Sequence, residues 1–241
     1  MGGNIIITGA SSGIGQATAE RFLAEGWNVG LLARREDRLR DLAASSDRAQ
    51  VLVADVTNEA EVAAAFVRFQ KRFARLDVLF NNAGVFTQGG VIDEVGLDDW
   101  RKSVDVNLTG AFICAQAAFG MMRRQTPQGG RIINNGSISA QSPRANSAPY
   151  TATKHAISGL TKSISLDGRA FDIAAGQIDI GNAATEMVSA LAERAKAGDA
   201  EPVMDVVHVA QAVFQMAKLP LDTNILSMTI MATKMAFVGR G

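Results

Sequence analysis

The segment 4–15 most constrains what this chain can fold into. Three consecutive isoleucines, Ile5–Ile7, predict a strand that is buried on both faces, as in the centre of a parallel sheet. A turn that contains Gly9, Gly13 and Gly15 follows and leads into a predicted helix. Because such a turn exposes backbone N–H groups at a helix N-terminus, it can bind an anion such as a pyrophosphate. The segment therefore predicts a dinucleotide-binding unit of strand, turn and helix.

The glycine spacing leaves an alternative open. It is G-x-x-x-G-x-G, which differs from the more familiar G-x-G-x-x-G fingerprint. Taken alone, the pattern is also compatible with a glycine-rich turn that binds no ligand. If the turn does bind a dinucleotide, we expect the contacts to come from the three glycines and from Ser11, Ser12 and Ile14.

The rest of the chain alternates predicted strands with predicted helices. Further strands are expected at 28–33, 50–53, 78–80, 131–137 and 226–231, and the segment 97–124 is expected to form one long helix or two in close succession. This alternation predicts right-handed βαβ units and an α/β fold with a Rossmann-like, doubly wound parallel sheet. The length of 241 residues fits a single domain, 1–241.

Composition excludes several classes of function. Lys and Arg together number 24, as do Asp and Glu, so bulk charge gives no reason to expect binding to nucleic acid or to a membrane surface. Cys114 is the single cysteine, and His155 and His208 lack a ligand pattern, so we expect no disulfide within the chain and no metal site. We find no signal-peptide pattern and expect no membrane span, which favours a cytoplasmic protein.

The end of the second predicted strand bears on cofactor choice. An acidic residue there would bind the ribose 2′-OH of NAD, but this chain has Ala33, followed by Arg34 and Arg35. Because arginine binds phosphate bidentately, the pattern predicts NADP(H), with Arg34 as the nearest donor and Arg35 sharing the contact. NAD(H) is the alternative, and the basic pair could also simply begin a solvated helix. Asp55 could accept a hydrogen bond from the adenine amino group, with Val56 beside it.

Four polar residues are candidates for catalysis. Tyr150, the only tyrosine, and Lys154 share one face of a predicted helix. A nearby ammonium lowers the pKa of a phenol from about 10, which would make Tyr150 a usable general acid or base. Ser137 ends the fifth predicted strand, on the side where open α/β sheets bind ligands. On these grounds alone, Asn107 is more typical of a packing residue, and a Tyr–Lys pair on a helix is usually structural.

The motifs together resemble those of the classical short-chain dehydrogenase/reductase family. They are Thr8-Gly9-x-x-x-Gly13-x-Gly15, Asn81-Asn82-Ala83-Gly84, Asn107, Ser137 and Tyr150-x-x-x-Lys154, in this order. The resemblance extends from Asn4 to about Asp167 and continues more loosely to the C-terminus. It implies an oxidoreductase that interconverts a carbonyl and an alcohol with NADP(H) or NAD(H).

The resemblance also implies roles for individual residues. Tyr150 would exchange a proton with the substrate oxygen, and Lys154 would lower the pKa of that tyrosine and bind the nicotinamide ribose. Ser137 would hold and polarise the substrate oxygen, while Asn107 would anchor a water linked to Lys154. The segment 82–84 would line the adenosine side of the cofactor site.

The later part of the chain departs from the family pattern. Ile180 stands in place of a family proline, although Gly181 is retained. Thr185 occupies the place of a threonine that would contact the carboxamide or the pyrophosphate, and the segment 185–201 would form a substrate lid. A further difference is Ala-Thr-Lys at 232–234, where the family commonly has Asp-Gly-Gly.

The expected partners are a small carbonyl or alcohol substrate and further copies of the chain. Similar proteins pair the two helices around 97–124 and 150–167 into dimers and tetramers, so we expect a homo-oligomer. A non-catalytic dinucleotide-sensing protein on the same fold is the alternative function. The complete set of Asn107, Ser137, Tyr150 and Lys154 argues against it, because a sensor needs no proton relay.

Overall fold

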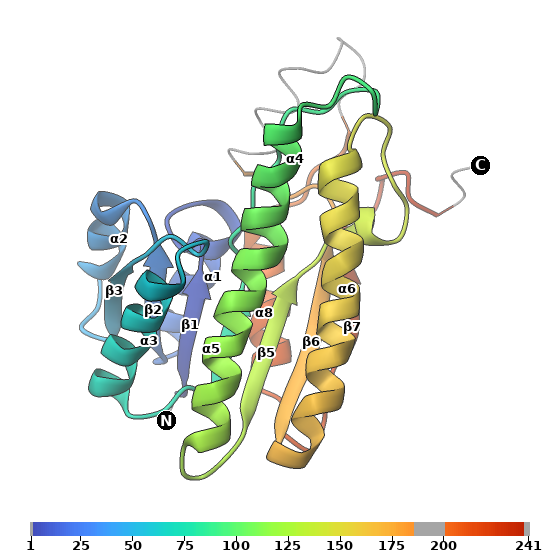
Figure 1. Ribbon diagram of the computed structural model, residues 1–241. Helices are drawn as coiled ribbons and strands as arrows, with labels where there is room; N and C mark the ends of the chain where they lie inside the picture. The colour runs from blue at the N-terminus through green and yellow to red at the C-terminus, as the bar shows by residue number, and fades with distance from the viewer. Residues whose placement is uncertain (1, 186–200, 239–241) are drawn as a thin grey trace.

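The chain folds around a parallel sheet, seen in a computed structural model that describes residues 2–185 and 201–238 (Figure 1). The described residues form seven parallel strands in the order β3-β2-β1-β4-β5-β6-β7. The strands are β1 (Asn4–Thr8), β2 (Asn28–Ala33), β3 (Ala49–Val53), β4 (Val78–Asn81), β5 (Gly130–Asn135), β6 (Ile173–Ile180) and β7 (Ser227–Ile230). The strand order reverses between β1 and β4, and ligands bind at such a switch point in open α/β sheets.

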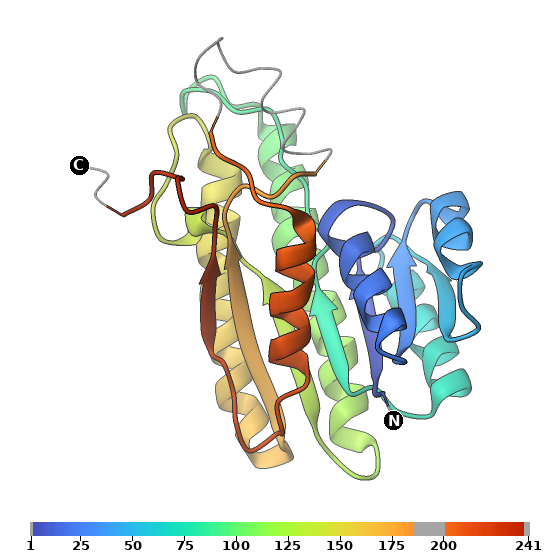
Figure 2. The same ribbon diagram turned by 180° about the vertical axis from the view of Figure 1, so that it is seen from behind.

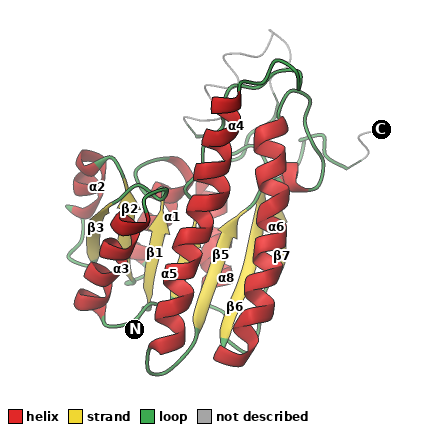
Figure 3. Ribbon diagram, in the orientation of Figure 1, coloured by secondary structure: helices red, strands yellow, loops and turns green. Residues whose placement is uncertain are grey.

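Helices cover both faces of the sheet (Figures 1 to 3). One face carries α1 and α8, which pack together, and the other carries α3, α5 and α6. The helices are α1 (Gly13–Ala24), α2 (Glu36–Ala43), α3 (Glu59–Phe73), α4 (Leu97–Val104), α5 (Gly110–Arg124), α6 (Ala148–Gly168) and α8 (Val206–Ala217). The predicted α/β class and the Rossmann-like parallel sheet are therefore confirmed.

The three isoleucines of β1 form part of both hydrophobic cores. Ile5 and Ile7 belong to the core under α1 and α8, whereas Ile6 belongs to the core under α3 and α5. All three have no exposed surface. Successive side chains of a strand point to opposite faces, so this burial requires helices on both sides of β1. The glycine turn after β1 consequently follows a strand that is buried on both faces.

A π-helical turn (Asp105–Thr109) joins α4 to α5, so that the segment 97–124 is helical throughout. Leu97–Arg124 meets the length and composition of a membrane span, with a mean hydropathy of 1.2, although no such span was expected. Cys114, Ala118 and Met122 in α5 have no exposed surface and belong to the core beneath the sheet. This burial is typical of a core helix, and length and composition alone are weak evidence for a span.

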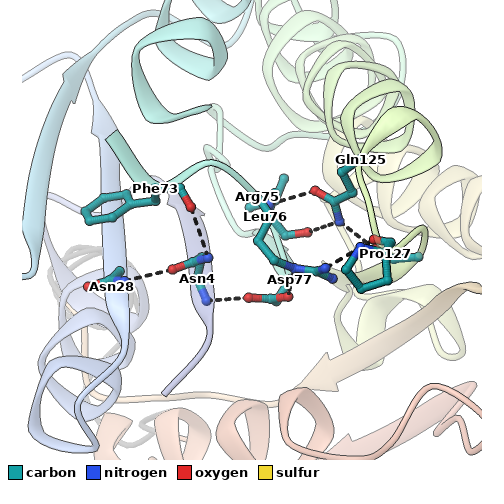
Figure 4. A network of polar contacts seen from close by, with 9 residues as sticks. Asn4, Asn28, Phe73, Arg75, Leu76, Asp77, Gln125 and Pro127 are labelled. Atoms are coloured by element: carbon teal, nitrogen blue, oxygen red, sulfur yellow. Dashed lines mark hydrogen bonds and ion pairs between the residues drawn. The ribbon is translucent and has the colours of Figure 1, made fainter. Parts of the chain in front are cut away.

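A polar network ties the amino end of the sheet together (Figure 4). The backbone N–H of Asn4 donates to Asp77 Oδ2 at 2.8 Å, and Arg75 Nε donates to Asp77 Oδ1 at 2.6 Å. Gln125, just after α5, accepts from the N–H of Leu76 at 2.9 Å and donates to its carbonyl at 2.8 Å. These contacts join β1, the residues before β4 and the end of α5 at the edge opposite the carboxyl ends of the strands.

Candidate active site

A pocket of about 420 Å³ lies at the carboxyl ends of the central strands, beside the switch point between β1 and β4. Its walls contain every residue that the sequence predicted to contact the cofactor except Gly15. These lining residues are Gly9, Ser11, Ser12, Gly13, Ile14, Arg34, Arg35, Asp55, Val56, Asn82, Ala83, Gly84, Tyr150, Lys154, Gly181 and Thr185. The fold thus brings distant motifs to one cavity, while their contacts with a cofactor stay a prediction.

The turn between β1 and α1 depends on its glycines. Gly9 and Gly13 have positive φ angles of 67° and 52°, a region that side-chain-bearing residues rarely adopt. A Cβ atom on Gly13 would lie 3.1 Å from Thr185 Cγ2. A Cβ atom on Gly15 would lie 2.2 Å from the carbonyl oxygen of Gly9, so this glycine permits α1 to pack against the turn rather than forming the pocket wall. The N-terminus of α1, which begins at Gly13, therefore forms one side of the pocket.

Two arginines line the pocket beyond the end of β2. The guanidinium of Arg35 donates to Ser11 Oγ at 3.2 Å and to Ser12 Oγ at 2.7 Å, so it lies across the glycine turn. Arg34 has a side chain that is 72% exposed and forms an ion pair with Asp55 at 3.4 Å. Two positively charged side chains therefore line the pocket at the end where the sequence predicted a 2′-phosphate.

Asp55 is held as a carboxylate at the end of β3. Partial burial raises the pKa of Asp55. Hydrogen bonds from the backbone N–H and hydroxyl of Thr57, at 3.0 and 2.8 Å, and the charge of Arg34 lower it, and together they outweigh the effect of burial. The net pKa lies below the ordinary value. A fixed acceptor thus faces the pocket where an adenine amino group was expected.

Side-chain hydrogen bonds hold the segment after β4 against β1 and β5. The Thr8 hydroxyl accepts from the N–H groups of Asn82 and Ala83, each at 2.8 Å. Asn82 Nδ2 donates to the Thr8 carbonyl at 2.9 Å, and Asn82 Oδ1 accepts from Asn135 Nδ2 at 2.8 Å. Asn82 therefore connects three strands beneath the pocket.

Three of the four candidate catalytic residues lie close together, and two of them, Tyr150 and Lys154, line the pocket, whereas Ser137 lies behind its wall. Lys154 Nζ lies 5.5 Å from the centroid of the Tyr150 ring and donates to the carbonyl of Asn135 at 2.8 Å. The Ser137 side chain is close enough to Tyr150 to act on the pKa of its phenol, which it lowers. Lys154 and Ser137 are only 6% and 5% exposed. A phenol and an ammonium thus face the pocket, and a hydroxyl group lies close to the phenol.

Burial dominates the electrostatics of this group. It raises the pKa of Tyr150 above its ordinary value, and the nearby Ser137 side chain and the charge of Arg144 act in the opposite direction. Burial also lowers the pKa of Lys154 to about 8, against the influence of Asp179. The lowered tyrosine pKa expected from the Tyr150–Lys154 spacing is therefore not found. The reason is that desolvation penalises the phenolate and the ammonium alike.

Asn107 lies in the π-helical turn and is 2% exposed. Its Oδ1 accepts from the N–H of Val85 at 2.7 Å, while its Nδ2 donates to the Val85 carbonyl at 2.9 Å and to Thr153 Oγ1 at 3.3 Å. It therefore joins the loop after β4 to α6 and is not part of the pocket wall. Its role in holding a water stays a prediction.

The departure from the family pattern at position 180 lies at the end of β6. Ile180 pairs with Ile230 of β7, and Gly181 N–H donates to the Ile230 carbonyl at 2.8 Å. This hydrogen bond comes from the N–H of Gly181, so it does not depend on whether proline or isoleucine stands at position 180. The predicted lid, 185–201, lies outside the described residues apart from Thr185 and Glu201.

Sequence reasoning missed several polar residues around this site. Asn135 accepts from Lys154, and Gln177 and Asp179 are buried on β6 close to Ser137. The sequence does show two polar residues, Gln177 and Asp179, inside an otherwise apolar strand. Their hydrogen-bond partners lie on other elements, so their role could not be predicted before the positions of those elements were known.

A doubly wound sheet with a glycine turn, basic side chains and a Tyr–Lys pair around one pocket is the arrangement expected of a dinucleotide-binding protein. Residues 3–196 match the family of short chain dehydrogenases. The chain belongs to this family.

Three known proteins illustrate the relationship. The chain is 36% identical to a 3beta-hydroxysteroid dehydrogenase of Mediterraneibacter gnavus over 167 residues, which is 68% of this chain and 59% of that protein. It is 31% identical to sulfoacetaldehyde reductase 2 of Chromohalobacter salexigens over 242 residues, covering 97% and 95% of the two chains. A solved structure of serine dehydrogenase in complex with NADP+ superimposes with a TM-score of 0.90 over 99% of this chain and 98% of the other. At 24% identity, this last likeness shows the fold alone.

The overlap with some relatives is partial. The chain spans 59% and 65% of the lengths of two of the curated relatives that it matches. The relationship therefore establishes the family, whereas substrate, cofactor preference and assembly belong to the proposals below.

Proposed function

We propose that the protein interconverts a carbonyl and an alcohol by hydride transfer with NADP(H), and that Tyr150 is its general acid and base. One observation carries this proposal. Tyr150 and Lys154 line the same pocket as the glycine turn, and Ser137 is close enough to Tyr150 to act on the pKa of its phenol. A substrate oxygen bound between the two hydroxyl groups would have both a proton donor and a second hydrogen-bond donor.

The nicotinamide ring, when bound, supplies or accepts the hydride. During reduction, Ser137 holds the substrate oxygen by a hydrogen bond, and the phenol of Tyr150 donates its proton to that oxygen. The Lys154 ammonium stabilises the phenolate that this leaves behind. Because the Asn135 carbonyl accepts a hydrogen bond from Lys154, the ammonium is held in place beside the ring. A tyrosine whose pKa is raised stays protonated at neutral pH, which suits the donor role in reduction.

The preference for NADP(H) over NAD(H) rests on the end of β2. Ala33 provides no carboxylate for a 2′-OH, whereas Arg34 and Arg35 both line the pocket. Arginine binds phosphate through charge-assisted, bidentate hydrogen bonds. These two guanidinium groups are the side chains that would hold the adenosine 2′-phosphate.

The assembly we propose is a homo-oligomer in the cytoplasm. Trp100 on α4, Phe112 on α5 and Leu166 on α6 are 41%, 48% and 61% exposed, and α5 and α6 lie side by side in Figure 1. Large apolar side chains on adjacent helices favour burial against another copy. Light scattering on the purified protein should show a mass above that of one chain, and Phe112→Glu should reduce it.

The direct test of the activity is a screen of NADPH oxidation across ketones and aldehydes with the wild type and Tyr150→Phe. The variant keeps the ring but loses the proton donor, so the rate on an accepted substrate should fall by about a hundred- to ten-thousand-fold. Its affinity for NADPH should persist. A variant with nearly wild-type rates would overturn the role of Tyr150. A wild type that binds NADPH but turns over no carbonyl would favour the sensing protein instead.

A further inference from the structure

A carboxylate is buried directly behind the candidate catalytic serine. Asp179, on β6, is 2% exposed. Its Oδ1 accepts from the backbone N–H of Ser137 at 3.1 Å and from the side chain of Gln177, and its Oδ2 accepts from Gln141 Nε2 at 2.8 Å. The carboxylate therefore holds the backbone at Ser137 and the side chain of Gln141, which follows the short 3-10 helix (Ile138–Ala140).

Gly136 makes this close approach possible. A Cβ atom at position 136 would lie 2.1 Å from Asp179 Oδ1 and 2.7 Å from Gln177 Nε2. Any larger residue there would displace the carboxylate or the serine backbone. The position of the Asp179 carboxylate thus depends on the absence of a side chain at position 136.

A buried carboxylate is costly unless it is hydrogen-bonded and paired with a cation. The amide donors satisfy its hydrogen bonds. Asp179 forms no ion pair with Lys154, but its charge acts on Lys154 over a longer distance. Lys154 lies on α6 between Tyr150, on the same helix, and the Asn135 carbonyl of β5, while Asp179 acts from β6. Arg144, before α6, acts on Tyr150. The buried negative charge that acts on the Lys154 ammonium is therefore that of Asp179, on β6.

We propose that Asp179 is a positioning residue of this active site, which orients Ser137 through its backbone and supplies the negative charge that opposes Lys154. The inference rests on the proposed function and extends it to a residue that contacts neither the pocket nor the reacting atoms. Burial brings the pKa of Lys154 down to about 8, and the carboxylate resists that fall. Without the carboxylate, Lys154 would lose its proton near neutral pH and could no longer stabilise a Tyr150 phenolate.

The test compares Asp179→Asn with a matched control, Asp172→Asn. The first variant keeps an oxygen that can accept from the Ser137 N–H but removes the charge. The control removes a charge from an exposed residue that directly precedes β6, where a φ angle of 54° suits asparagine as well as aspartate.

Lys154 is titrated by NMR in protein labelled at the lysine ε-carbon. The chain has only seven lysines, and Lys154→Met identifies the signal.

This titration needs neither substrate nor cofactor, so it succeeds or fails independently of the proposed function. In Asp179→Asn the pKa of Lys154 should fall by about one unit or more, whereas Asp172→Asn should leave it unchanged. An unchanged pKa in Asp179→Asn would overturn the inference even if the enzyme reduces carbonyls. Conversely, a wild type without any turnover would end the proposed function and leave the electrostatic result intact.

Kinetics on an accepted substrate separate the electrostatic role from a merely structural one. For Asp179→Asn we expect about a tenfold lower kcat at neutral pH, partial recovery toward lower pH where Lys154 regains its proton, and an unchanged Kd for NADPH. A loss of kcat that is the same at every pH would contradict the assigned role.

If Asp179→Asn does not fold, Gly136→Ala provides the second variant, because it displaces the carboxylate without removing it. Wild-type kcat and Lys154 pKa in Gly136→Ala would then overturn the inference.

Discussion

The guanidinium of Arg35 lies 2.7 Å from the hydroxyl of Ser12, so a side chain beyond β2 closes over the glycine turn that follows β1. Arg34, the neighbouring residue, pairs instead with Asp55 and is largely exposed. The sequence pointed to Arg34 as the nearest donor to a 2′-phosphate. The structure places Arg35 at least as close to the turn where the cofactor phosphates would bind.

The first prediction concerns cofactor choice. A charge-assisted hydrogen bond contributes about 1.5–3 kcal/mol, so NADPH should bind roughly ten- to a hundredfold more tightly than NADH. Ala33→Asp/Arg34→Ala should shift the preference toward NADH, because the new carboxylate repels a 2′-phosphate and accepts from ribose hydroxyls. Arg35→Ala should weaken NADPH binding more than NADH binding. Titration of each variant with both cofactors measures these constants.

The control for this series is Arg38→Ala, which removes an exposed arginine of α2 that is not part of the pocket wall. Its affinities should match those of the wild type. Equal affinity of the wild type for NADPH and NADH would show that the basic pair does not read the 2′-phosphate.

The second prediction concerns the glycine turn. Gly13→Val places a branched side chain at a φ angle of 52° and against Thr185, so NADPH binding should be lost while the fold persists. Gly159→Ala is the control, because a Cβ atom there meets no atom within 4 Å and lies in a helix. Calorimetric titration measures binding, and circular dichroism checks the fold. Undiminished affinity in Gly13→Val would exclude the turn as the phosphate site.

The third prediction links Lys154 to the pH dependence of stability. Its pKa is about 8 in the folded protein against an ordinary value of 10.5, so between these values the unfolded chain binds more protons. Stability arising from Lys154 therefore rises with pH, by about 1 kcal/mol from about pH 8 to about pH 9. Urea unfolding of the wild type and of Lys154→Met at both pH values isolates this difference.

The comparison with Lys154→Met removes a competing effect. Burial raises the pKa of Cys114 to about 12 from 9.0, so this thiol destabilises the folded protein as pH rises above about 9. Both proteins contain Cys114, and its effect cancels in their difference. A difference that is constant from about pH 8 to about pH 9 would mean that Lys154 keeps an ordinary pKa.

The fourth prediction concerns the polar network of Figure 4. Gln125→Leu leaves the N–H and carbonyl of Leu76 and the carbonyl of Gly129 without the amide that binds them at 2.7–2.9 Å. We expect a loss of about 1–3 kcal/mol in the free energy of unfolding, with NADPH binding unchanged. Gln128→Leu, an exposed residue with one hydrogen bond to the Arg123 carbonyl, should cost much less. Similar losses in the two variants would show that the network adds no stability.

Much of the fold and many of the pocket residues could be predicted from the sequence because their signals are local. Ile5–Ile7 indicated a strand buried on both faces, and the glycines after it indicated a turn at a helix N-terminus. The spacing of Tyr150 and Lys154 placed both side chains on one face of α6. These patterns depend on the strand and helix periodicities, which a chain carries before it folds.

Only the tertiary structure decided which side chains meet and how deeply they are buried. It placed Arg35 over Ser12, joined Asp179 to Ser137, and reversed the expected direction of the Tyr150 pKa. None of these features has a periodic or short-range signal, because each joins elements that are far apart in sequence or depends on the exclusion of water by the whole fold. Desolvation is a property of the packed protein, and for this reason the protonation of the active site could not be predicted from the spacing of its residues.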